Sequence, residues 1–219
     1  MGIVVLVWGS AFPAIGAAVL HYEPGQLVLL RFLVASTVLG ARALAIRQPL
    51  PQRQDLVMIG LAALAGVVGY QVPLSYGQRV VSAGAASLLI NTSPIFTVLL
   101  AAIFLRDRMS PAGWVGVGIS FAGACVVSVA ASASLRLEPA ALLVIFAAAA
   151  GAVYTVLQKP LLTRYTPLQY TSYIVWTGAA LLLVFAPGLL TAVRDAPRSA
   201  TYAVVYLGLS PSIAGYALF

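Results

Sequence analysis

Apolar residues fill this chain in runs close to the length of a membrane-spanning helix, which needs about 20 residues. Short polar breaks separate eight such runs, at residues 2–20, 26–46, 56–77, 82–105, 112–131, 139–159, 168–190 and 201–219. With 62% hydrophobic and 8% charged residues, the composition is unlike that of a soluble globular protein. Hydrocarbon offers no water to backbone polar groups, so each run is expected to be helical. The sequence therefore predicts an all-α polytopic membrane protein.

Basic residues in the polar breaks predict the orientation, because cytoplasmic loops of membrane proteins are enriched in Lys and Arg. With the N-terminus inside, seven basic residues fall in or beside the inner breaks: Arg42, Arg47, Arg53, Arg106, Arg108, Lys159 and Arg164. Four fall in the outer breaks: Arg79, Arg136, Arg194 and Arg198. We therefore expect a cytoplasmic N-terminus in a bacterial inner membrane. The net charge of +7 is scattered rather than clustered, so no nucleic-acid partner is expected.

The stretch Ser82–Ser110 combines small, polar and charged steps within one apolar run. Its opening residues SAGAAS allow close helix packing, and Asn91-Thr92-Ser93-Pro94 places polar groups near its middle. Pro94 cannot donate a hydrogen bond to Ile90, so we predict one kinked helix of about 24 residues. Polar, kinked backbone at mid-depth is tolerated where it faces protein or a water-filled cavity. This pattern predicts a path through the membrane.

The same stretch, ended by Arg106-Asp107-Arg108 and followed by Trp114-Val-Gly116-Val-Gly118, resembles EamA-type proteins of the drug/metabolite transporter superfamily. Trp8-Gly9-Ser10-Ala11-Phe12 and Arg31-Phe32 extend the resemblance over nearly the whole chain. The resemblance implies two inverted repeats of five transmembrane helices, ten in all. It also implies transport of small metabolites by alternating access.

An internal repeat in the sequence agrees with the two inverted repeats that the resemblance implies. His21–Gln26 aligns with Arg164–Gln169 at an offset of 143, sharing Tyr, Pro and Gln, and Gly69-Tyr70 aligns with Gly215-Tyr216 at an offset of 146. Five helices separate the copies, and an odd number inverts the second copy. We expect a first repeat at residues 1–135 and an incomplete second repeat of three helices at residues 136–219. About eight of the ten helices are then present, and the second repeat is expected to be truncated.

The charged residues restrict the class of substrate. All five acidic residues lie in or beside the polar breaks: Glu23, Asp55, Asp107, Glu138 and Asp195. An intramembrane carboxylate is the usual counter-ion of a cationic substrate, so a lipophilic-cation pump is disfavoured. Arg31 is the one charge well inside an apolar run, away from its ends. It either snorkels or pairs with Glu23, or it supplies a counter-charge for a substrate carboxylate.

Polar and aromatic side chains away from the helix ends are the candidates for lining a cavity. Asn91 fits either interhelical hydrogen bonding or a cavity wall. Tyr70 and its repeat counterpart Tyr216 are predicted to form opposed walls or gates, whereas Tyr22 and Tyr165 fit the interfacial aromatic belt. The predicted substrate-binding set is Trp8, Ser10, Arg31, Tyr70, Gln71, Tyr76, Asn91, Tyr154, Gln158 and Tyr216.

These observations predict a secondary transporter of neutral, zwitterionic or anionic metabolites such as amino acids, with export as the expected direction. Its partners are the lipid bilayer and the metabolite, and a homodimer is left open. Two alternatives are a truncated, non-transporting scaffold protein and a drug efflux protein. An enzyme is not predicted, because one His, one Cys and the absence of paired acids at depth supply no catalytic constellation. No cofactor, metal or catalytic residue is expected.

Overall fold

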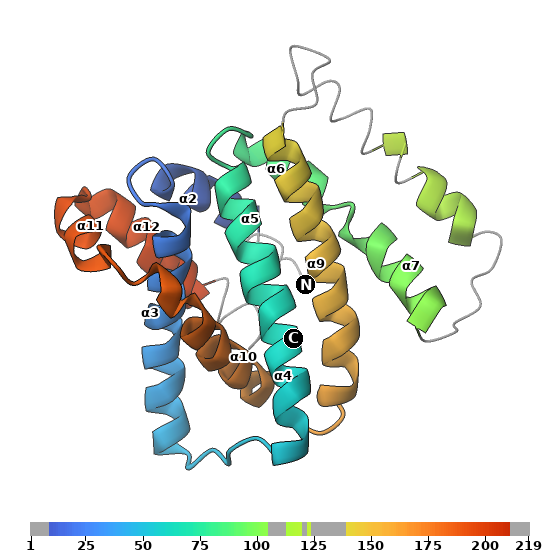
Figure 1. Ribbon diagram of the computed structural model, residues 1–219, viewed down its shortest axis with the longest axis horizontal. Helices are drawn as coiled ribbons and strands as arrows, with labels where there is room; N and C mark the ends of the chain where they lie inside the picture. The colour runs from blue at the N-terminus through green and yellow to red at the C-terminus, as the bar shows by residue number, and fades with distance from the viewer. Residues whose placement is uncertain (1–8, 105–112, 120–121, 124–138, 211–219) are drawn as a thin grey trace.

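The computed structural model describes residues 9–104, 113–119, 122–123 and 139–210, and helices are the regular elements of these segments. In chain order the elements are α2 (Ala11–Ala18), α3 (Pro24–Ala45), η1 (Arg53–Asp55), α4 (Leu56–Ala63), η2 (Leu64–Gly69), α5 (Tyr70–Gly77), α6 (Ala83–Ile90), α7 (Ser93–Phe104), α9 (Pro139–Leu161), α10 (Pro167–Leu181), η3 (Leu182–Phe185), α11 (Leu189–Asp195) and α12 (Arg198–Leu209). Residues 113–119 are also helical. Figure 1 shows their arrangement.

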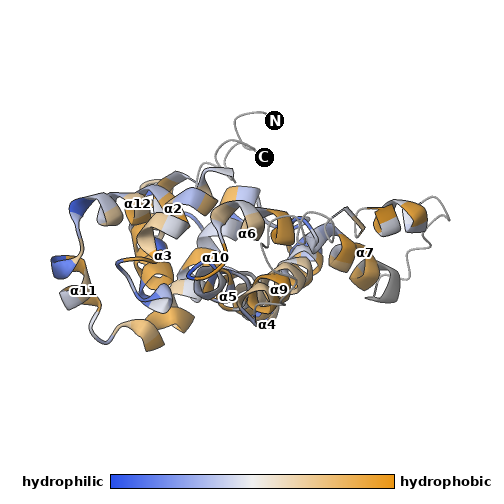
Figure 2. Cartoon of the chain, turned by 90° about the horizontal axis from the view of Figure 1, so that it is seen from above, coloured by the Kyte–Doolittle hydropathy of each residue, from blue (hydrophilic) through white to orange (hydrophobic). Residues whose placement is uncertain are grey.

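Within those segments, five stretches are long and apolar enough to cross a membrane: Pro24–Ala45, Arg53–Gly77, Ala83–Leu100, Pro139–Leu161 and Pro167–Phe185. Large apolar side chains of these stretches, such as Leu44, Val57 and Phe146, are more than half exposed, as expected of surfaces that face lipid. Figure 2 shows that hydrophobic residues make up much of α7 and α9. The prediction of an all-α polytopic membrane protein is confirmed.

The kink predicted near Pro94 is a break between two helices. α6 ends at Ile90 and α7 begins at Ser93, with a turn at Asn91 and Thr92. The Thr92 hydroxyl donates to the Leu89 carbonyl at 2.7 Å, so it satisfies one acceptor of the last turn of α6. Pro94 lacks the N–H that would continue the helical ladder. The polar step is therefore an interruption of the span.

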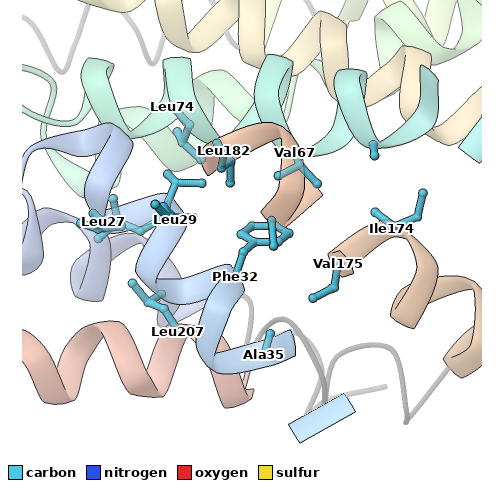
Figure 3. Packing of buried hydrophobic residues seen from close by; sticks show 14 of the residues in the cluster. Leu27, Leu29, Phe32, Ala35, Val67, Leu74, Ile174, Val175, Leu182 and Leu207 are labelled. Atoms are coloured by element: carbon cyan, nitrogen blue, oxygen red, sulfur yellow. The ribbon is translucent and has the colours of Figure 1, made fainter. Parts of the chain in front are cut away.

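The core is formed around α3. This helix packs against α5, α10 and α12, and α9 packs against α5 and α7 on the other side (Figure 1). Figure 3 shows the apolar side chains that meet between α3, α10, α12 and the α4–α5 region. They include Leu27, Leu29, Phe32, Val67, Leu74, Ile174, Val175, Leu182 and Leu207, all less than 9% exposed.

Small residues set the distance between helices in this core. A Cβ at Gly208 would lie 2.8 Å from the Arg31 carbonyl oxygen and 3.0 Å from Val34, and one at Gly178 would lie 2.6 Å from Val67. Lipid tails give apolar helices no hydrophobic reason to associate, so close packing at such positions holds them together. Gly208 thereby fixes α12 against α3 beside Arg31.

The two ends of the bundle are defined by different loops. The α2 end carries residues 19–24, 78–82 and 196–198, and the α4 end carries residues 46–55 and 162–166 (Figure 1). The repeated segment starts a helix at each end. Pro24 is the first residue of α3, and Pro167 is the first residue of α10, where Thr166 and Gln169 form a capping box.

Gly208→Ala is expected to lower the free energy of unfolding by about 1–3 kcal/mol, because the added methyl overlaps the α3 backbone. Gly60→Ala is the matched control, since nothing lies within 4 Å of a Cβ there. Its stability should be unchanged or slightly higher. Thermal unfolding in detergent micelles compares the two, and equal midpoints for both variants would contradict this account of the α3–α12 contact.

Candidate functional site

The centre of the candidate site is Arg31, which α3 places about 10 Å along the helix from Pro24. The residue is 5% exposed. Its Nε donates to the Leu207 carbonyl of α12 at 3.1 Å, and its Nη1 donates to Gln71 Oε1 of α5 at 3.0 Å. A guanidinium inside a membrane protein is costly, which makes Arg31 a candidate functional residue. Three helices thus orient this cation in the protein interior.

Neither structural alternative expected for Arg31 is observed. Glu23 instead accepts from Arg79 Nη2 at 2.7 Å and from the Tyr76 hydroxyl at 3.2 Å. The side chain of Arg31 is buried between helices, so it does not snorkel to an interface. The expected pairing with Glu23 is wrong because Arg79 occupies that carboxylate. The same contacts place Tyr76 at the α2 end of the bundle.

Gln71 and Tyr70 point to different helices. Gln71 faces Arg31, whereas Tyr70 lies against α9, where a Cβ at Gly151 would come within 3.0 Å of its ring. The π-helical segment η2 precedes both residues, and Pro73 follows them inside α5. π-helical turns inside α-helices are frequent at functional sites. Tyr70 and Gln71, two predicted site residues that are adjacent in the sequence, therefore lie at different helix interfaces, α5–α9 and α3–α5.

The remaining predicted residues are dispersed. The Tyr154 ring stacks on Tyr170 with centroids 6.2 Å apart, and Gln158 lies half-buried one turn farther along α9. Ser10 Oγ lies 2.6 Å from the Tyr206 hydroxyl of α12. Asn91 is exposed and lines a cavity of about 320 Å³ with Pro94, Ile95, Val98, Gly113, Gly116 and Val117. Trp8 and Tyr216 lie outside the described residues, so the Tyr70–Tyr216 pair stays a prediction.

A hydrogen-bonded cluster at the α4 end joins distant parts of the chain. Asp55, whose side chain is 7% exposed, accepts from Arg164 Nη1 at 2.6 Å and from the Tyr165 hydroxyl at 2.7 Å. The Tyr165 oxygen also accepts from the Gln52 backbone N–H at 3.0 Å. We call Asp55, Arg164 and Tyr165 the α4-end clasp. A cavity of about 270 Å³ lies beside it, lined by Gln54, Asp55, Met58, Pro160, Leu161 and Arg164.

A neutral counterpart lies at the α2 end. The Tyr22 hydroxyl and Thr201 Oγ1 are 2.7 Å apart, and these two residues form the α2-end clasp. Tyr22 is 1% exposed, so the prediction that it belongs to the lipid-facing aromatic belt is wrong. Sequence reasoning missed both clasps. A signal was present, because Thr201 follows Asp55 by 146 residues, the offset that relates Gly69-Tyr70 to Gly215-Tyr216.

Comparisons with known proteins agree with this architecture. The profile of the EamA-like transporter family matches residues 1–129. A probable terminal-alkyne amino-acid exporter of Streptantibioticus cattleyicolor is 42% identical over 212 residues, which cover 97% of this chain and 71% of that protein. The uncharacterized transporter YdfC of Bacillus subtilis is 34% identical, covering 96% and 69%. A solved crystal structure with 23% identity superposes with a TM-score of 0.65, covering 98% of this chain and 74% of that one, and shows likeness of fold alone.

Tyr165→Phe is expected to lower the stability of the protein by about 1 kcal/mol at neutral pH, through loss of the hydrogen bond to Asp55. Burial, and then this hydrogen bond, raise the pKa of Tyr165 above 10.0. The stabilisation is therefore fully present below about pH 10 and is lost as the pH rises through the folded-state pKa. Thermal unfolding of both proteins across this range measures the difference. A difference that is zero at pH 7, or that grows above pH 10, would contradict the assignment.

Proposed function

The chain belongs to the EamA-like transporter family, and we propose that it is a secondary transporter that moves small amino-acid-like carboxylates across the bilayer. The expected direction is export. The observation that carries this proposal is the buried Arg31 between α3, α5 and α12. The proposed role of this residue is to bind the carboxylate of the substrate.

The chemistry of the site supports this substrate class. The Leu207 carbonyl and the Gln71 amide orient the guanidinium, and both of these acceptors are neutral. A carboxylate forms short, charge-assisted hydrogen bonds with a guanidinium, often two in parallel. The acidic residues of the sequence lie in or beside the polar breaks, which disfavours a cationic substrate. The relative from Streptantibioticus cattleyicolor is a probable exporter of terminal-alkyne amino acids, which belong to the same class of substrate.

The clasps support alternating access as the mechanism. Each one joins a residue of the segment 1–135 to a residue of the segment 136–219, and they lie at opposite ends of the bundle. Residues at equivalent positions of the proposed inverted repeats thus make a similar contact at each end. In this mechanism one end opens when its clasp breaks while the other clasp stays closed. The charged α4-end clasp is expected to be the stronger of the two.

Arg31→Gln is expected to reduce uptake of labelled amino acids into proteoliposomes at least about tenfold, because a neutral amide cannot replace a charge-assisted bond. Arg31→Lys should retain part of the flux. Arg79→Gln is the matched control, since Arg79 is a half-exposed cation at the α2 end, away from Leu207 and Gln71. Full flux in Arg31→Gln would contradict the proposed site. A well-folded protein without flux in any form would favour the scaffold alternative.

Opening of the ends can be followed by the labelling of single cysteines after Cys125 is replaced by Ala. Met58→Cys reports on the α4 end and Val19→Cys on the α2 end. Tyr165→Phe should raise the labelling rate at position 58 about fivefold and lower it at position 19, because one hydrogen bond is worth about 1 kcal/mol. Tyr22→Phe should do the reverse. Rates that rise together at both ends would contradict alternating access.

A further inference from the structure

One face of α5, extended by the residue that caps its C-terminus, carries three polar side chains in register. Gln71, Ser75 and Gln78 are spaced i, i+4 and i+7, so they lie above one another along the helix. The face points into the protein, because Ser75 is 1% exposed and Gln78 is 6% exposed. Gln71 at one end of this row accepts from Arg31. The row therefore leads from the Arg31 site toward the α2 end.

Two atoms of this row lack hydrogen bonds. Gln78 Nε2 donates to the Phe12 carbonyl of α2 at 3.1 Å, whereas Gln78 Oε1 and Ser75 Oγ are buried and have no partner among the groups that the structure describes. Buried polar atoms in native proteins are hydrogen-bonded in the great majority of cases. Two such atoms on the same face and one turn apart can accept hydrogen bonds from a single ligand.

We propose that Ser75 and Gln78 form an ammonium subsite, which binds the amino group of a substrate whose carboxylate lies on Arg31. This inference rests on the proposed function and adds the recognition of a zwitterion. Side chains three or four residues apart on a helix have Cβ atoms about 5–6 Å apart, so one ammonium group can reach Ser75 Oγ and Gln78 Oε1 together. The same spacing separates Ser75 from Gln71, the residue that holds Arg31 Nη1.

Neutral oxygens suit this role. An ammonium group needs acceptors to replace its hydration shell, and the amide and hydroxyl oxygens supply them without adding a charge to the membrane interior. A zwitterion brings its own negative charge to Arg31. The subsite is buried, and α2 holds Gln78 through the Phe12 carbonyl, so we expect a ligand to enter when this contact breaks. A water molecule would meet the same two acceptors, and the experiment separates the two ligands.

The test compares leucine with 4-methylpentanoate, the same compound without its amino group. Each unlabelled compound competes with labelled leucine for uptake into proteoliposomes, and the ratio of their half-inhibitory concentrations measures recognition of the ammonium. Ser75→Ala and Gln78→Met should each reduce the advantage of leucine about tenfold and leave competition by 4-methylpentanoate unchanged. Ser36→Ala is the matched control, because Ser36 Oγ is also buried without a hydrogen bond but lies on α3. It should keep the wild-type ratio.

Three results would overturn the subsite. The first is an unchanged ratio in both Ser75→Ala and Gln78→Met. The second is an equal loss of competition by leucine and by 4-methylpentanoate, as expected if the bound ligand is water. The third is a shift of the ratio in Ser36→Ala as large as in the α5 variants. Continued competition by 4-methylpentanoate shows that a variant is folded. Gln78→Glu gives a second test, because its carboxylate should increase the advantage of leucine over 4-methylpentanoate. Failure of the proposed function gives a different pattern: leucine flux is absent in the wild type or is independent of Arg31.

Discussion

The buried guanidinium of Arg31 is the constraint on which the rest of the structure depends. A charge in the interior of a membrane protein must be surrounded by acceptors, and none can come from lipid. α12 supplies a backbone carbonyl and α5 supplies an amide, each about 3 Å away. Both contacts require close approach of the helices, which Gly208 permits at the α3–α12 crossing. The same helix contacts thus form the site and pack the core.

Two clusters of polar contacts lie at the two ends of the bundle. The α4-end clasp contains an ion pair and a tyrosine hydroxyl, whereas the α2-end clasp contains two hydroxyl groups. Contacts of this kind can break and form without exposing a charge to lipid, because they lie near the ends of the spans. Close packing at small residues such as Gly208 holds the helices together at the centre of the bundle. Breakable polar contacts at the ends and tight packing at the centre suit a transporter, whose ends must open while its centre holds the substrate.

The sequence predicted the helical class and most spans because the length of an apolar run is set directly by bilayer thickness. It also singled out Arg31 as the one charge well inside a run. The partners of Arg31 were not predictable, because they depend on the rotation of α5 and α12 about their axes. The η2 segment shifts that rotation just before Tyr70 and Gln71. The break at Asn91 was predicted as a kink, since Pro94 signals a missing hydrogen bond but not the turn that Thr92 completes. Ser75 and Gln78 carried a readable signal in their spacing from Gln71, but their lack of hydrogen bonds is visible only in the structure.

Thermal unfolding of the purified protein with and without a saturating amino acid tests the central claim most directly. A ligand that binds only the folded state raises its stability by about 2.7 kcal/mol at a hundred times its dissociation constant. If Arg31 holds the substrate carboxylate, the wild type and Arg79→Gln are stabilised by the amino acid, and Arg31→Gln is not. The corresponding amide, which lacks the carboxylate charge, should stabilise none of them. Equal stabilisation of Arg31→Gln and the wild type would show that the carboxylate binds elsewhere and would contradict the account.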